Sequence, residues 1–368
     1  MEIYNQTLQL EIPYPVEKLV ARTNASSFED FLFFDIETTG LSADISSLYL
    51  IGCLYYREGS FHMIQWFADS YDSETDLLEA FFAKLKEFKV LLHYNGQGFD
   101  IPYLQKKVLQ YQLPHSFDGI ESIDLYREVR PFKKVLQLPN LKQKTIEEFL
   151  YLSREDEYTG KELIPIYGEY MKKKFSHEEN AQEQKLLLLH NDEDLKGMIS
   201  LLALCDYIDL FNERHEVVQI QKEETVISAT LRLSRPIARM VKYHNEGLSL
   251  EAHEDLLQIH VLYYEGELKY FYKNYKDYYY LPAEDMAIHK SVAEYVDRDF
   301  KEKAKKANCY IRKAGVFLPM CEDSSDSSIL LFKREVKDKQ GFMEVSAETF
   351  TNPELLEDYF HQLLCTLA

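Results

Sequence analysis

Apolar residues in the first third of the chain follow two kinds of pattern. Short apolar runs such as FLFFDIE, at 31–37, and KVLLHYN, at 89–95, are typical of buried β-strands. The segment 48–68 holds two such runs on either side of a glycine turn, which predicts a pair of strands. In 73–88 and 100–112 apolar residues recur at helical spacing instead, so both segments are predicted to be helices.

The order of these segments predicts the fold class. Three strands, a helix, a strand and a helix in succession are typical of an α/β fold with a mixed sheet flanked by helices. Further helices are expected at 143–151, 161–174 and 179–211. We therefore expect an N-terminal extension at 1–26, followed by an α/β domain at 27–213.

The pattern changes in the last part of the chain, where a second domain is expected at 214–368. Alternating apolar and polar residues at 216–234 and 256–282 predict strands. The segment 287–307 and the residues from about 353 onward predict helices. These features favour a separate C-terminal α+β domain, whose role the sequence does not indicate.

Length and composition limit the classes of protein to consider. The chain has 368 residues, 46% of them hydrophobic, which allows a sizeable core and argues against a disordered chain. Its apolar runs are too short to span a bilayer, and its first residues lack the pattern of a secretory signal, so no membrane association is expected. The 5 cysteines are scattered without CxxC spacing, which favours a cytoplasmic protein without disulfides or a zinc site.

The formal net charge of −20 restricts the partners that are expected. Most of this charge falls on residues 1–213, whereas phosphate binding is normally helped by positive surface. The charge therefore argues against tight, non-specific binding of duplex nucleic acid. It is compatible with a phosphate substrate if metal ions supply positive charge locally.

Two acidic residues end the first predicted strand. Asp35 and Glu37 are two positions apart in DIETTG, so they share one face of a strand while Ile36 points to the other face. Two like charges this close repel each other unless a positive charge lies between them. This pair predicts a bound cation.

Further acidic residues follow at two places in the α/β domain. Asp100 comes after a predicted strand and a glycine-containing turn, where a role as an ordinary helix cap is the alternative. His190 and Asp194 are four positions apart and would share one face of a helix, with Asp192 and Glu193 turned toward solvent. If these carboxylates converge with the first pair, they would form a site for two divalent cations, Mg²⁺ or Mn²⁺.

These motifs resemble a known family. DIETTG, the later HYNGQGFDIPYL and the histidine–aspartate helix are similar to the DEDD superfamily of 3′–5′ exonucleases, which have a ribonuclease H-like fold. LPNLKQKTIEEFL and HNDEDL fall where the YprB-like branch has similar sequences. The resemblance covers roughly residues 27–212 and says little about the rest.

The resemblance implies roles for particular residues. Asp35, Glu37, Asp100 and Asp194 would bind the metal ions, and His190 would occupy the general-base position. The family usually places a histidine base five residues before the last aspartate, whereas here the spacing is four, which is the spacing of the tyrosine-containing members. His190 could therefore activate water, orient it or only contact phosphate, and a purely structural histidine is a further alternative.

Other residues of the same motifs are candidates for substrate contact. Thr38, Asn95 and Phe99 are expected to bind substrate, Phe99 by stacking on a base, although Phe99 could equally belong to the core. Asp124 is interpreted as the cap of a helix beginning at Leu125 rather than as a metal ligand.

Three hypotheses for the function differ in class. The first is a metal-dependent 3′–5′ exonuclease that hydrolyses phosphodiester bonds of single-stranded DNA or RNA by a two-metal-ion mechanism. The second is a nucleic-acid-binding or scaffolding protein that keeps the ribonuclease H-like fold with little or no catalysis. The third is an endonuclease or an enzyme acting on duplex ends. The basic run at 298–313 is a candidate nucleic-acid surface, for which an exposed helix flank is the favoured interpretation.

Overall fold

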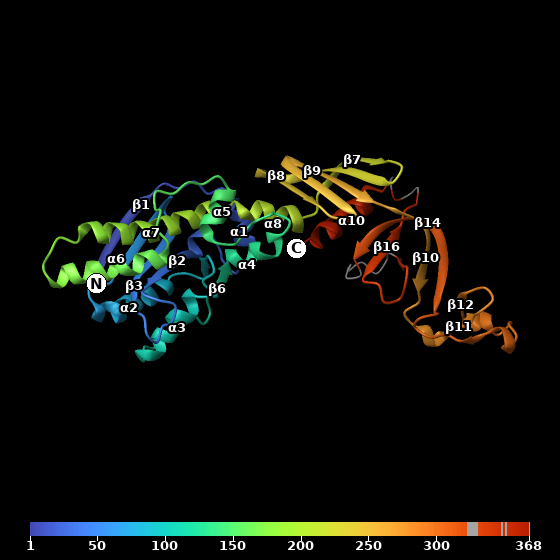
Figure 1. The fold of residues 1–368 in the computed structure, drawn as a ribbon, viewed down its shortest axis with the longest axis horizontal. Coiled ribbons are helices and arrows are strands. Elements are labelled where there is room, and N and C mark those ends of the chain that lie inside the picture. Colours follow the sequence, from blue (N-terminus) through green and yellow to red (C-terminus); the bar gives the residue numbers. More distant parts are fainter. Residues whose placement is uncertain (322–329, 347–348, 350–351, 368) are drawn as a thin grey trace. The chain divides into compact units, whose positions relative to one another are not determined.

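The computed structural model describes residues 1–321, 330–346, 349 and 352–367 (Figure 1). The chain forms two compact units, Met1–Ile208 and Asp209–Ala368. The predicted limits of 1–26, 27–213 and 214–368 remain a proposal.

The first unit is built on a mixed β-sheet. Three of its neighbouring strands run parallel, namely β2 (Phe31–Thr38), β5 (Val90–His93) and β6 (Glu121–Asp124), and the other pairs of neighbours are antiparallel. The N-terminal residues, expected to be an extension, supply the edge strand β1. The strands lie in the order β1 (Glu2–Leu8), β4 (Ser60–Phe67), β3 (Leu48–Arg57), β2 (Phe31–Thr38), β5 (Val90–His93) and β6 (Glu121–Asp124).

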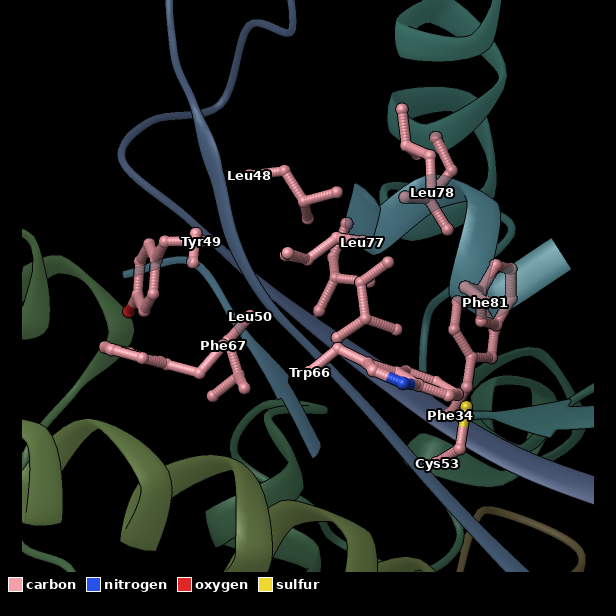
Figure 2. Packing of buried hydrophobic residues seen from close by; sticks show 14 of the residues in the cluster. Phe34, Leu48, Tyr49, Leu50, Cys53, Trp66, Phe67, Leu77, Leu78 and Phe81 are labelled. Atoms are coloured by element: carbon pink, nitrogen blue, oxygen red, sulfur yellow. The ribbon is translucent and has the colours of Figure 1, made fainter. Parts of the chain in front are cut away.

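Helices cover both faces of this sheet, as the sequence predicts. Alternate residues of β2 show the two faces, because the ring of Phe34 lies 5.4 Å from Phe81 while the carboxylate of Asp35 meets Asn191. Phe81 belongs to α2 (Glu74–Leu85) and Asn191 to α7 (Ala181–Leu201). Figure 2 shows Phe81 pointing toward Phe34 and Cys53 in the core.

The remaining helices of the first unit complete this layered arrangement. On the α7 face, α6 (Gly160–Phe175) packs beside α7 (Figure 1). Its Tyr167 stacks on Tyr49, with the ring centroids 4.4 Å apart. The sequence therefore predicted the main elements of this unit correctly. Their bounds are α1 (Val16–Ala21), α3 (Asp100–Gln110), α4 (Leu125–Val129), α5 (Gln143–Phe149), α6 (Gly160–Phe175) and α8 (Leu204–Asn212), the last of which continues into the second unit.

The second unit is rich in β-strands. One sheet contains β7 (Glu216–Lys222), β8 (Val226–His244) and β9 (Leu248–Leu262), and a closed barrel contains β10 (Tyr264–Phe271), β14 (Tyr310–Cys321), β16 (Gln340–Glu344) and β15 (Leu331–Lys333). A small sheet joins β12 (Met286–His289), β11 (Tyr278–Leu281) and β13 (Glu302–Lys303). The predicted C-terminal helix is present as α10 (Pro353–Cys365).

One helix prediction in this unit is wrong. The segment 287–307 forms the end of β12, the short helix α9 (Lys290–Ala293), a 3-10 turn and β13. Pairing of β11 with both β12 and β13 explains the difference, since these backbone hydrogen bonds replace those of a continuous helix.

Two sequence expectations concern membranes and disulfides. Within the described residues, no helix is both long and apolar enough to cross a membrane. Among the described residues, Cys53, Cys205, Cys309 and Cys365 are not part of a disulfide.

Candidate active site

A pocket of about 770 Å³ opens beside the ends of β2 and β5 in the first unit. Asp35, Glu37, Asp100, His190 and Asp194 all line it. These five residues come from one strand and two helices that are far apart in the sequence. The structure therefore brings the predicted carboxylates and the histidine into a single site.

The β2 carboxylates face α7, as their spacing predicts. Asp35 Oδ2 accepts a hydrogen bond of 2.9 Å from Asn191 Nδ2, and Glu37 Oε2 accepts one of 3.4 Å from the hydroxyl of Tyr49. Ile36, between them, is buried in the core on the other side of the strand. Both carboxylates of the pair therefore reach the pocket from the same face of the sheet.

His190 connects the β2 pair to Asp194. Its Nε2 lies 3.5 Å from Glu37 Oε1 and 3.4 Å from Asp194 Oδ2. Its Nδ1 lies 2.7 Å from Asp156 Oδ2, and Lys144 Nζ contacts the same carboxylate oxygen at 3.0 Å. A carboxylate accepts hydrogen bonds only, so Nδ1 carries the proton when the ring is neutral and the lone pair of Nε2 faces Glu37 and Asp194.

This group of side chains has the chemistry of a cation site. Among the described residues, Glu37, His190 and Asp194 each offer a ligand atom, and these atoms lie within 4.8 Å of one another. Asp35 and Asp100 line the same pocket and could supply further oxygen ligands. Carboxylate oxygens are suitable ligands for Mg²⁺ or Mn²⁺, so the four carboxylates, and not the imidazole, are the candidate ligands.

Asp100 begins α3 after the turn formed by HYNGQGF. Asp124 organises this turn by accepting hydrogen bonds from the backbone N–H groups of Asn95 (2.8 Å) and Gln97 (3.2 Å). It also accepts one of 3.1 Å from Tyr126 N, which confirms the predicted cap of α4. Asp124 therefore supports the site through the turn that positions Asp100.

The electrostatics of the pocket favour a positive charge. Burial raises the pKa of Asp35 well above its ordinary value, and the charges of Asp194, Glu37 and Asp100 add to this. Burial and the charges of Asp194 and Asp100 raise the pKa of Glu37 in the same way. Burial also raises the pKa of Asp100 to about 7. A bound cation would reverse these shifts by stabilising the ionised carboxylates.

Arg154 is a charged residue of the site that the sequence did not indicate. Its Nη1 lies 2.6 Å from Asp194 Oδ1, on the opposite side of that carboxylate from His190. Its other nitrogens bind the buried carboxylate of Glu147. Arg154 thus fixes the orientation of Asp194 and leaves Oδ2 directed at the histidine. No motif around Arg154 could have revealed this contact.

Asn191 is a second residue that the sequence did not indicate. It is fully buried, and its Oδ1 accepts a hydrogen bond of 2.9 Å from Gln65 Nε2, which directs Nδ2 toward Asp35. A Cβ atom at Gly52 would clash with Asn191 Oδ1, so the absence of a side chain in β3 makes room for this amide. The position of Asn191 directly after His190 was the only available signal.

The predicted substrate-binding residues differ in their placement. Asn95 and Phe99 line the pocket, and Phe99 also packs against the core. Asn95 adopts a left-handed backbone (φ 62°), a conformation that asparagine tolerates better than most residues, so it has a structural role as well. Thr38 is not among the lining residues, and its hydroxyl donates to the carbonyl of Gly40. The substrate contacts remain proposals for all three.

The expected exposure of two residues on α7 needs correction. Asp192 is buried and accepts hydrogen bonds from Gln6 Nε2 (3.1 Å) and Lys196 Nζ (2.5 Å), so its predicted exposure is wrong. Glu193 is half-buried and accepts from the backbone N–H groups of residues 155 and 156. It therefore holds in place the segment that carries Asp156.

Comparison with known proteins identifies the family that this region matches. Residues 32–205 match the family described as the RNase_H superfamily. The matched range contains all five of the predicted catalytic residues. No curated protein matches the chain at a significant level.

Solved structures with partial similarity include a DNA polymerase and an exonuclease. The family B DNA polymerase of Pyrobaculum calidifontis matches at 16% identity and a TM-score of 0.37, over 67% of this chain and 35% of the polymerase. Escherichia coli exonuclease I in a complex with single-stranded DNA and zinc matches at 12% identity and a TM-score of 0.31, over 60% of this chain and 54% of the exonuclease. The chain thus spans about a third of the first protein and about half of the second, and TM-scores this low support no conclusion about function.

Proposed function

Residues 32–205 form a ribonuclease H-like domain, and on this premise we propose that the domain is a divalent-metal-dependent 3′–5′ exonuclease of the DEDD type. Its substrate would be single-stranded DNA or RNA, from which it would release nucleoside monophosphates by phosphodiester hydrolysis. The superfamily match supports a nuclease in general. The 3′–5′ polarity and the exonuclease mode depend on the resemblance of DIETTG and HYNGQGFDIPYL to that family.

One observation carries the proposal: four carboxylates and a histidine from three distant segments line one pocket. Burial raises the pKa values of Asp35, Glu37 and Asp100, and the charges of neighbouring carboxylates add to this, which fits a site made for cations. Asp35, Glu37, Asp100 and Asp194 would hold two Mg²⁺ or Mn²⁺ ions. When bound, such ions supply positive charge that activates water and stabilises the leaving oxygen.

His190 has the geometry of a proton acceptor at this site. The lone pair of Nε2 faces the carboxylates, where the attacking water would lie, and Nδ1–H donates to Asp156. On accepting a proton the ring becomes positive, and the carboxylate of Asp156 would stabilise that charge. In this proposal Arg154 and Asn191 keep Asp194 and Asp35 in place while the proton moves.

The test uses 5′-labelled single-stranded DNA and RNA oligonucleotides with Mn²⁺. We expect a ladder of products that shortens from the 3′ end, and we expect Asp194→Asn to abolish it, since this nearly isosteric change removes one ligand charge. Asp118→Asn, at an exposed position outside the pocket, is the matched control and should retain activity. Retained activity in Asp194→Asn would remove Asp194 from the ligand set, and internal cleavage products would indicate an endonuclease.

The ion pair between Arg154 and Asp194 favours one alternative. The guanidinium already supplies a positive charge to the acidic pocket, as in a nucleic-acid-binding protein that needs no metal. A thermal-shift titration with Mn²⁺ separates the two functions. The exonuclease proposal expects a metal-dependent rise in melting temperature that is lost in Asp35→Ala, whereas the scaffold expects no rise.

A further inference from the structure

We propose that the pocket also contains a phosphate-binding site, formed by Lys133 and Lys142, for the nucleotides next to the cleaved bond. This inference depends on the proposed function and extends it, because it names the part of the substrate that the pocket recognises. Both lysines line the same pocket as the carboxylates. The substrate class that follows is an oligonucleotide strand with several phosphates.

The two lysines of the pocket differ from several other lysines of the first unit. Lys106, Lys107 and Lys144 each form an ion pair with a carboxylate. Within the described residues, the exposed ammonium groups of Lys133 and Lys142 form no ion pair, although the protein carries a net charge of −20. An unpaired ammonium beside an acidic site can bind an anionic substrate without first breaking an internal contact.

The loop that carries Lys142 is fixed relative to the carboxylates. The hydroxyl of Tyr94 donates a hydrogen bond of 2.8 Å to the carbonyl of Leu141, and Lys142 N donates one of 2.8 Å to the side chain of Asn140. The next residue, Gln143, donates through Nε2 to the carbonyl of Asp194 at 3.0 Å. These contacts hold the backbone at Lys142 in place beside the helix that provides Asp194.

Aromatic side chains accompany the cations. Tyr94 and Tyr126 line the pocket, with their rings edge to face at 6.1 Å, and Phe99 lines it from the start of α3. Rings that are only partly buried can stack on bases of any sequence. Cations for the backbone together with aromatic faces for bases are typical of single-strand binding without sequence preference.

The charge of the pocket explains why a nucleic-acid substrate would need the phosphate-binding site in addition to the metal ions. Four carboxylates repel a phosphodiester, so metal ions would have to compensate at the scissile phosphate. Neighbouring phosphates lie beyond those ions and would still experience the acidic surface. Lys133 and Lys142 would neutralise them, and their effect should therefore increase with the number of phosphates in the substrate.

Two substrates of different length test the proposal. Thymidine 5′-(p-nitrophenyl phosphate) has a single phosphodiester, whereas a ten-residue thymidine oligonucleotide has several. We expect the double variant Lys133→Ala/Lys142→Ala to raise KM about tenfold for the oligonucleotide, and to leave the kinetics of the ester unchanged. The dependence of log(kcat/KM) on log salt should become shallower by about 0.7 for each lysine. Lys134→Ala, exposed but outside the pocket lining, is the matched control and should behave as the unmodified protein.

A direct binding measurement keeps this inference separate from the proposed function. Fluorescence anisotropy with a labelled ten-residue thymidine oligonucleotide reports affinity whether or not the protein is catalytic. Weaker binding in the double variant than in Lys134→Ala would support the phosphate site even if no hydrolysis occurs. In that case the proposed exonuclease function would be wrong, and the phosphate site would still be supported. Equal affinity of the unmodified protein, the double variant and Lys134→Ala would overturn the phosphate site. An equal rise in KM for the ester and the oligonucleotide would overturn it as well.

Discussion

At the scale of single residues, the tautomer and the orientation of the His190 ring depend on a partner far away in the sequence. Asp156 accepts a hydrogen bond of 2.7 Å from Nδ1–H. Lys144 binds the same carboxylate, and the Glu193 carboxylate accepts from the backbone N–H of Asp156. With Nδ1 bound to Asp156, the lone pair of Nε2 faces the acidic cluster at the i, i+4 spacing between His190 and Asp194. A carboxylate that accepts from Nδ1–H in this way orients a histidine and stabilises its charged form.

We therefore expect Asp156→Ala to lower kcat by about 10- to 100-fold, since the ring of His190 would lose its orientation. Steady-state kinetics on a single-stranded oligonucleotide with saturating Mn²⁺ would measure this effect. Glu157→Ala, at the exposed neighbouring position, is the control and should leave kcat unchanged. A change of less than twofold in Asp156→Ala would contradict the role of Asp156 in orienting His190.

At the scale of secondary-structure elements, close packing of α7 determines the site. Gly197 in α7 lies where a Cβ atom would clash with Glu147 Oε1 and come within 2.9 Å of Gln143 Nε2. The absence of a side chain there admits Glu147, and with it Arg154, which orients Asp194. Glycine has a low helix propensity, so its presence inside α7 is unexpected from propensity alone. The contacts that it allows explain it.

We predict that Gly197→Ala destabilises the protein. Glycine to alanine inside a helix usually stabilises by about 1 kcal/mol, but here the methyl group would displace the buried pair of Glu147 and Arg154. Urea unfolding measures the sign of the change. Gly168→Ala in α6 is the matched control, because nothing lies within 4 Å of its Cβ position, and it should stabilise. Stabilisation by both substitutions would contradict the packing argument.

Contacts with neighbouring strands also involve the basic residues at 298–313. Arg312 and Lys313, on β14, form ion pairs with Glu267 (3.0 Å) and Glu344 (2.6 Å) on neighbouring strands. Lys301 donates to the carbonyl of Val296 at 2.7 Å. These internal contacts weaken the hypothesis of a nucleic-acid surface in this segment, because each would compete with a phosphate.

At the scale of the whole molecule, the buried carboxylates link stability to pH and to metal. The folded state raises the pKa of Asp35, Glu37 and Asp100, so it binds more protons than the unfolded chain between the ordinary carboxyl pKa and about 7. The contribution of these groups to folding free energy is therefore greatest at low pH and is lost as pH rises through the raised values. A bound cation would replace the protons, so the folded state would no longer lose this stability as pH rises.

We expect the melting temperature of the EDTA-treated protein to decrease from pH 5 to pH 8. Saturating Mg²⁺ should reduce this decrease, and Asp100→Asn should reduce it without metal, because one of the responsible groups is removed. Scanning calorimetry in matched buffers measures all three conditions. A melting temperature that responds neither to Mg²⁺ nor to the substitution would contradict a cation site at these carboxylates.

The sequence by itself determined the features that depend on local backbone geometry. A strand places Asp35 and Glu37 on one face, and a helix places His190 and Asp194 one turn apart, whatever surrounds them. The mixed sheet and its helices followed from the same periodicities and are confirmed by the structure.

Only the tertiary structure decided which distant groups meet. Three contacts of the site join segments whose spacing in the sequence does not predict that they meet. These are Arg154 with Asp194, Asp156 with His190, and the amide of Asn191 with Asp35. Burial of Asp192 and the loss of the helix predicted at 287–307 have the same origin, since long-range hydrogen bonds outweighed local preference. The physical reason is that periodicity is a property of one segment, whereas a partner is chosen by packing, burial and charge in the complete fold.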